Sequence, residues 1–118
     1  MNLVALRNAV KALTGPIPKT RPYSVWEPWW VITSFLEDAQ AEDLLGALTG
    51  SIDASERFRD KMLPGSYLTL NINSVRKDKT YATVGGAGLV ETHTVHPSES
   101  IARVLVILEA LIEGDDDL

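Results

Sequence analysis

Cysteine is absent from this chain, and its absence excludes three kinds of chemistry. The chain forms no disulfide, has no thiol nucleophile and offers no thiolate ligand to a metal. No apolar run approaches the roughly 20 residues that a membrane-spanning helix needs. Met1–Leu13 also lacks the basic start and the cleavage site of a secretory signal. These absences predict a cytoplasmic protein without a membrane segment.

Length and composition limit the domain organisation. The 118 residues are 45% hydrophobic and 23% charged, which is typical of a globular protein. A chain of this length has room for one hydrophobic core. We therefore predict a single α+β domain over 1–113, followed by an acidic tail over 114–118.

Charge is unevenly distributed along the chain. The net charge is −5, and acidic residues dominate between Glu27 and Asp60. Nucleic-acid binding needs concentrated cations that displace counterions from phosphates, so we expect no nucleic-acid partner. The acidity indicates a protein partner with a basic surface. The alternative is that the acidic residues only keep a small protein soluble.

The longest apolar stretch predicts a C-terminal helix. In Ser98–Ile112, Leu105 and Leu108 recur at helical spacing among other apolar residues, and Ser98 is suited to cap the first turn. The apolar face is so broad that a whole sheet is needed to cover it. The residues just upstream, Tyr67–Val95, supply that sheet.

Three segments alternate between apolar and polar residues with a period of two, which is typical of strands with one buried face. In the first, Leu68, Leu70 and Ile72 are the apolar set. Short turns join the segments, so neighbouring strands are antiparallel. The predicted meander consists of Tyr67–Val75, Thr80–Val84 and Leu89–Val95, with a polar turn at Arg76–Lys79 and a glycine turn at Gly85–Gly88.

Helices are predicted before the sheet. Asn2–Leu13 has apolar residues on one face. Trp29–Ala39 has the spacing of an amphipathic helix, which we favour, and the β propensity of Trp29–Phe35 leaves a strand as the alternative. A kink or a second short helix precedes Gly50, and Asp53–Glu56 resembles a capping box that begins a further helix. The prediction is a meander packed by N-terminal and C-terminal helices, with a helical insertion before the sheet.

Two stretches of the chain resemble a known family. Tyr23–Ser24 leads to Trp30–Val31, and Glu91–Thr94 leads through Pro97 to the final helix. Together with the order of the predicted elements, these residues make the chain similar to the small bacteriophage proteins of the phage ABA sandwich family. The resemblance implies a phage origin and no defined activity, and it supplies no catalytic residues.

Tryptophan is concentrated in one short segment. All three tryptophans lie between Trp26 and Trp30, and tryptophan often anchors protein interfaces. Trp29 has the phase of a core residue and Trp30 does not, although all three could instead pack onto the core. The acidic residues that follow are expected to be solvated. The predicted partner-binding residues are Trp26, Trp30, Glu37, Asp38, Glu42 and Asp43.

The polar face of the predicted sheet is an alternative site, the floor of a small-ligand or nucleotide site. Its residues are Tyr67, Thr69, Asn71 and His93. Glu91 shares a face with His93, but no recognisable motif ties a serine nucleophile to them, and we expect both to face solvent. His96 lies on the opposite face from His93, so the two histidines are not placed to bind one metal.

The sequence therefore predicts a non-enzymatic, phage-type accessory protein that binds a host or phage protein, without metal, cofactor or catalytic residues. An inhibitor of host defence, such as an anti-CRISPR protein, fits its size, acidity and lack of catalytic groups. The alternative is a protein that binds a small ligand or nucleotide on the polar sheet face. A three-stranded meander has two open edges, so a homodimer is also expected.

Overall fold

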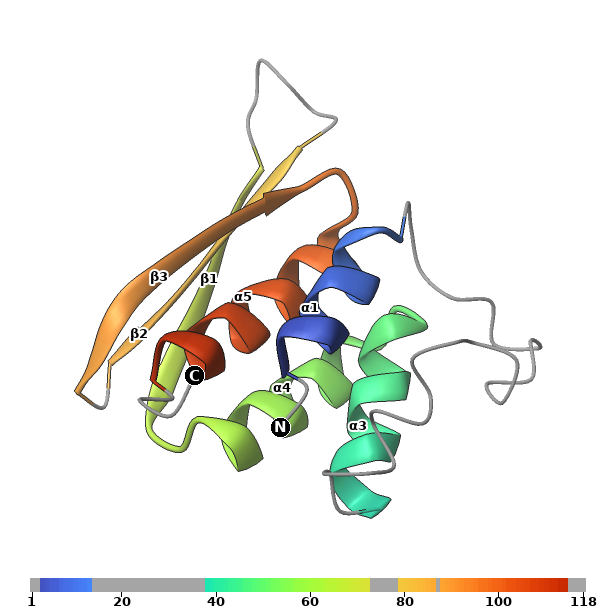
Figure 1. Ribbon diagram of the computed structural model, residues 1–118, viewed down its shortest axis with the longest axis horizontal. Helices are drawn as coiled ribbons and strands as arrows, with labels where there is room; N and C mark the ends of the chain where they lie inside the picture. The colour runs from blue at the N-terminus through green and yellow to red at the C-terminus, as the bar shows by residue number, and fades with distance from the viewer. Residues whose placement is uncertain (1–2, 14–37, 73–78, 87, 115–118) are drawn as a thin grey trace.

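The computed structural model describes residues 3–13, 38–72, 79–86 and 88–114. The strands form one antiparallel sheet in the order β1-β2-β3. The predicted α+β fold, a meander packed by helices with a helical insertion before it, is confirmed (Figure 1). Its elements are α1 (Leu3–Lys11), α3 (Asp38–Leu48), α4 (Ile52–Met62), β1 (Ser66–Ile72), β2 (Thr80–Gly86), β3 (Leu89–His96) and α5 (Glu99–Glu113).

Helix α5 lies between the sheet and the other helices (Figure 1). It contacts β2 and β3 on one side and α1, α3 and α4 on the other, so it is buried around most of its circumference. Burying an aliphatic side chain contributes about 1.5–3 kcal/mol, so this helix is the centre of the core. Its buried residues are Ile101, Ala102, Val104, Leu105, Val106, Ile107, Leu108 and Ala110. The predicted packing of the last helix across the meander is confirmed.

Helix α1 packs against α5 from the side opposite the sheet. It buries Leu3, Leu6 and Val10, which recur at helical spacing as predicted. Arg7 Nη1 lies 2.6 Å from Glu109 Oε1 of α5, which ties the polar edges of the two helices together. No helix within the described ranges is long and apolar enough to cross a membrane.

Serine side chains cap two helices. The Ile101 N–H donates to Ser98 Oγ at the start of α5, as predicted. At the start of α4, however, the Ala54 N–H donates to Ser51 Oγ at 3.1 Å. The predicted capping box at Asp53–Glu56 is therefore wrong, because the N-cap residue is Ser51, two positions before Asp53. Asp53 lies in the first turn instead, where its negative charge interacts favourably with the positive end of the helix dipole.

The two histidines lie on opposite faces of the sheet, as their spacing predicts. His96 is buried, and its Nδ1 accepts a hydrogen bond from the Ser98 N–H at 2.9 Å. Because Nδ1 is the acceptor, Nε2 carries the proton and donates to the Leu13 carbonyl at 2.8 Å. His96 thus joins the end of α1 to the junction between β3 and α5.

Strand β2 is longer than predicted. Gly85 and Gly86 continue the ladder with β1, opposite Tyr67 and Ser66. The predicted glycine turn therefore starts too early. Glycine is a poor strand former in isolation, but here cross-strand pairing with β1 decides the conformation.

Candidate functional site

The candidate site lies on the face of the sheet that points away from α5. The helices that the structure describes all lie on the other side of the sheet (Figure 1). We call this surface the outer face. The alternation of side chains along the strands places eight residues on it: Tyr67, Thr69 and Asn71 of β1, Tyr81 and Thr83 of β2, and Glu91, His93 and Val95 of β3.

Cross-strand pairing arranges these residues in rows. Thr83 lies between Thr69 and His93, while the next row contains Asn71, Tyr81 and Val95. The four residues predicted for a ligand site therefore do share one surface, and all four are exposed. That site remains a prediction, because shared exposure alone does not show that a ligand binds.

Tyr67 lies across a glycine of the neighbouring strand. A Cβ atom built on Gly85 would stand 2.7 Å from Tyr67 Oη and 2.9 Å from its Cζ, which is closer than atoms can approach. Gly85 is therefore required for the ring to lie against β2. The contact limits the positions open to the ring of Tyr67, which still has 46% of its surface exposed.

Three polar groups of the outer face form a hydrogen-bonded row. His93 Nδ1 lies 2.9 Å from Thr83 Oγ1, and His93 Nε2 lies 3.1 Å from Glu91 Oε1. The order carboxylate, imidazole, hydroxyl is the one that hydrolases use to activate a nucleophile. Here the side chains of His93 and Glu91 are 64% and 57% exposed.

An oxyanion hole needs free N–H groups directed at the reacting centre. The N–H groups around Thr83 belong to a central strand, and both neighbouring strands pair with it. Among the described residues, His93 is held between Thr83 and Glu91 on an exposed part of the sheet.

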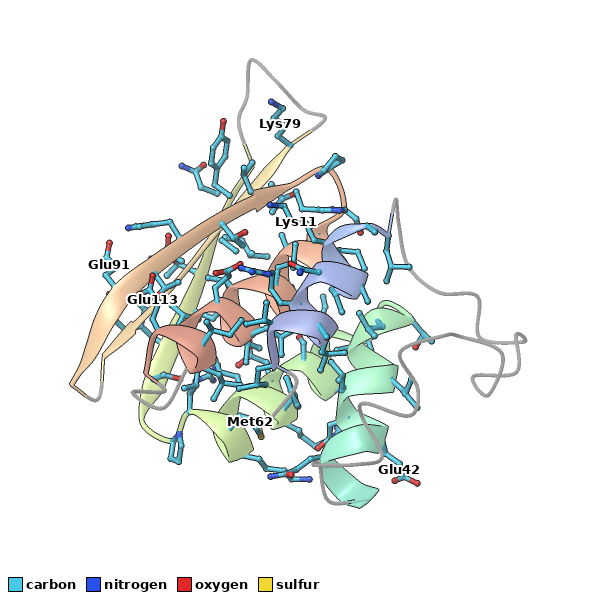
Figure 2. All side chains as sticks on the ribbon, in the orientation of Figure 1. Lys11, Glu42, Met62, Lys79, Glu91 and Glu113 are labelled. Carbon is cyan, nitrogen blue, oxygen red and sulfur yellow. The ribbon has the colours of Figure 1, made fainter. Side chains whose placement is uncertain are left out.

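The outer face combines exposed apolar side chains with little charge. Tyr81 is 40% exposed and Val95 is 47% exposed in one row, and Tyr67 is exposed two positions along the face. Among the described residues of this face, Glu91 is the one carboxylate, and it lies on the side away from the helices (Figure 2). Protein interfaces are enriched in tyrosine and depleted of charge at their centres, so this composition is typical of an interface.

The predicted acidic surface is only partly supported by the structure. Glu42 is exposed and points away from α3 (Figure 2). Asp43 is only 6% exposed, so the prediction that it is solvated is wrong. Its carboxylate lies 3.0 Å from Arg57 Nε and 2.7 Å from Lys61 Nζ. The reason is that α4 packs against α3, and both cations come from α4.

These ion pairs set the ionisation of Asp43. Burial disfavours the charged carboxylate and on its own would raise the pKa. Hydrogen bonds from Lys61 and Arg57, and the positive charges of both side chains, outweigh burial and hold the pKa of Asp43 below its usual range. Asp43 is therefore a charged residue that joins two helices.

The other four predicted partner-binding residues have side chains outside the description. Trp26, Trp30 and Glu37 lie outside the described residues, and so does Trp29–Phe35, for which a strand is the alternative to a helix. Asp38 is the first residue of α3, and its side chain lies outside the description. Their role in partner binding stays a prediction.

A small pocket lies where the end of α3 meets the first turns of α4 and α5. Its volume is about 110 Å³, and Ser51, Ser100 and Arg103 contribute to its lining. Pockets for drug-sized ligands have volumes of roughly 300–1,000 Å³, so this one suits a few water molecules. Across the described ranges, no group of three or more histidine, aspartate or glutamate side chains is placed to hold a metal.

Sequence reasoning missed Tyr81, Thr83 and Val95 as members of the site. The signal was present, because the period-two alternation of Thr80–Val84 already puts Tyr81 and Thr83 on one face. Comparison with known proteins adds no relative: no family model, curated protein or solved structure matches the chain.

Proposed function

We propose that this protein is a non-enzymatic binding protein that recognises another protein through the outer face of its sheet. The supporting observation is the exposure of Tyr67, Tyr81 and Val95 on one face of the sheet, whose described residues carry little charge. Such residues provide large contact area at low entropic cost, and a face rich in tyrosine and poor in charge is typical of protein interfaces.

The resemblance to phage ABA sandwich proteins supports a narrower form of this proposal. In that form the chain acts in the cytoplasm on a host or phage protein, for example as an inhibitor of a host defence system. The net charge of −5 supports a partner with a basic surface. The tryptophan segment would then extend the contact beyond the outer face.

The proposal is tested by comparing matched variants as baits for partner capture. Tyr81→Ala removes an exposed ring from the outer face, and Ile52→Ala removes an exposed apolar side chain from the helical side. We expect Tyr81→Ala to weaken binding of the captured protein by at least about tenfold, and Ile52→Ala to leave it unchanged. Equal binding by wild type and Tyr81→Ala would contradict the proposal.

A nucleotide is a second candidate partner, because Tyr67, Thr69, Asn71 and His93 share one exposed face. A base would stack on a tyrosine ring while the polar side chains bind the sugar or phosphate. A ligand that binds the folded protein raises its melting temperature. A thermal-shift screen with ATP, GTP and their diphosphates tests this candidate, and the absence of any shift in melting temperature would contradict it.

A further inference from the structure

The first residue of β1 shows which backbone groups point away from the sheet. The Ser66 N–H donates to the Leu63 carbonyl at 3.2 Å, and the Ser66 carbonyl accepts from the Arg59 guanidinium. Both backbone groups of Ser66 are thus bonded outside β2, even though Ser66 lies opposite Gly86. In an antiparallel strand the N–H and C=O of one residue point to the same side, and that side alternates along the strand.

This alternation shows to which side the backbone groups of the other β1 residues point. The N–H and C=O groups that pair with β2 belong to Tyr67, Thr69 and Asn71. Those directed to the open edge belong to Leu68, Leu70 and Ile72. No backbone hydrogen bond between described residues reaches these three from outside the sheet. Arg59 and Leu63 close only the first position, so among the described residues a row of edge groups without a backbone partner begins at Leu68.

Strand β1 also lacks the features that protect an edge. Its sequence, Ser66–Ile72, contains no charged residue, proline or glycine. Proteins usually block open edges with such residues, because an unprotected edge pairs with another strand. The opposite edge differs, since β3 carries Glu91 among its edge residues. Pairing β1 with itself brings no like charges together.

We propose that a second copy of this chain pairs with β1, antiparallel and around a two-fold axis at Leu70. In this register Leu70 lies opposite Leu70 of the partner subunit, and Leu68 lies opposite Ile72 of the partner subunit. Every edge-directed residue then meets another one, and about six main-chain hydrogen bonds form. The result is a six-stranded antiparallel sheet. The pairing does not depend on the proposed function, but it joins the outer faces of two copies into one surface.

The proposed register can be tested by placing charged side chains at two positions of β1. Thr69 and Asn71 are exposed, and in this register Thr69 lies opposite Asn71 of the partner subunit. The double variant Thr69→Lys with Asn71→Lys therefore places like charges opposite each other twice, and we expect at least about tenfold weaker dimerisation. The matched double variant Thr69→Lys with Asn71→Glu places opposite charges there, and we expect it to dimerise like the wild type.

Light scattering coupled to size exclusion provides the first measurement. The wild type and the Lys/Glu double variant are expected at twice the 12.9 kDa chain mass, and the Lys/Lys double variant at the monomer mass. Circular dichroism confirms that each variant is folded. A monomeric wild type at high micromolar concentration would overturn the proposal, as would equal masses for the two double variants.

Hydrogen exchange provides a second measurement that needs no variant. The amides of Leu68 and Leu70 are expected to exchange rapidly in dilute solution and slowly at high concentration. The amides of Thr69 and Asn71, which are bonded to β2, are expected to be slow at both. Rapid exchange at Leu70 in concentrated solution would refute pairing at this edge. Tyr81 is on the central strand, so Tyr81→Ala tests partner capture while the dimer remains intact.

Discussion

The two faces of the sheet are made of alternate residues of the same strands, yet they differ in chemistry. On β2, Val84 and Ala82 are fully buried against the helical side, whereas their neighbours Thr83 and Tyr81 lie on the outer face. The face toward α5 contributes to the stability of the fold. The outer face has exposed side chains on all three strands, so we expect it to contribute less to stability. Separate substitutions on the two faces should therefore affect separate properties.

The largest difference in unfolding free energy is expected between an apolar side chain buried in α5 and one exposed on the outer face. Leu105 of α5 is 2% exposed, so Leu105→Ala leaves a cavity and should lower the free energy of unfolding by about 2–5 kcal/mol. Val95→Ala on the outer face should change it by less than about 0.5 kcal/mol. Urea denaturation of both variants measures the difference, and similar losses would refute this division of roles.

Two neighbouring carboxylates of α3 should show the same difference in stability between a buried and an exposed side chain. Asp43→Asn removes the charge that pairs with Arg57 and Lys61, and should cost about 1.5–3 kcal/mol at neutral pH. Glu42→Gln, one position earlier and exposed, should cost less than about 0.5 kcal/mol. Urea denaturation at neutral pH compares the two variants.

The effect of Asp43 should depend on pH in one direction. Because folding lowers the pKa of Asp43, its stabilisation is complete above the pKa of the unfolded chain, about 4, and is lost as the pH falls through the folded pKa. The wild type and Asp43→Asn should therefore converge in stability at acidic pH. A difference that grew on acidification would show that the ion pairs are not its source.

The smallest effects are expected from a reciprocal exchange on β2. Val84→Thr buries a hydroxyl without a partner and should cost about 1–3 kcal/mol. Thr83→Val exchanges one β-branched residue for another on the outer face and removes the hydrogen bond to His93, so it should cost less than about 0.5 kcal/mol. Thermal unfolding compares the two, and equal losses would show that the outer face is not free of structural constraint.

Local patterns explain what could be predicted from the sequence. The helices α1 and α5, the three strands, the Ser98 cap and the opposite orientations of His93 and His96 follow from periodicity or capping. Each such signal involves residues within a few positions of one another, so the chain itself carries it. The same period-two alternation predicted part of the outer face. It assigned residues of β1 and β3 to this face, but the side chains of β2 were not included.

Other features depended on contacts between distant segments. Asp43 is buried because α4 packs on α3, and Gly85 is in a strand because β1 pairs with it. The open edge of β1 is identified by two hydrogen bonds of Ser66, one donated to the Leu63 carbonyl and one accepted from Arg59, which no periodicity reveals. The sequence alone thus determined the core of α1, α5 and the three strands, and which of their side chains share a face. Only the tertiary structure decided which polar groups of the described residues are bonded to distant segments, because that depends on what packs against each face.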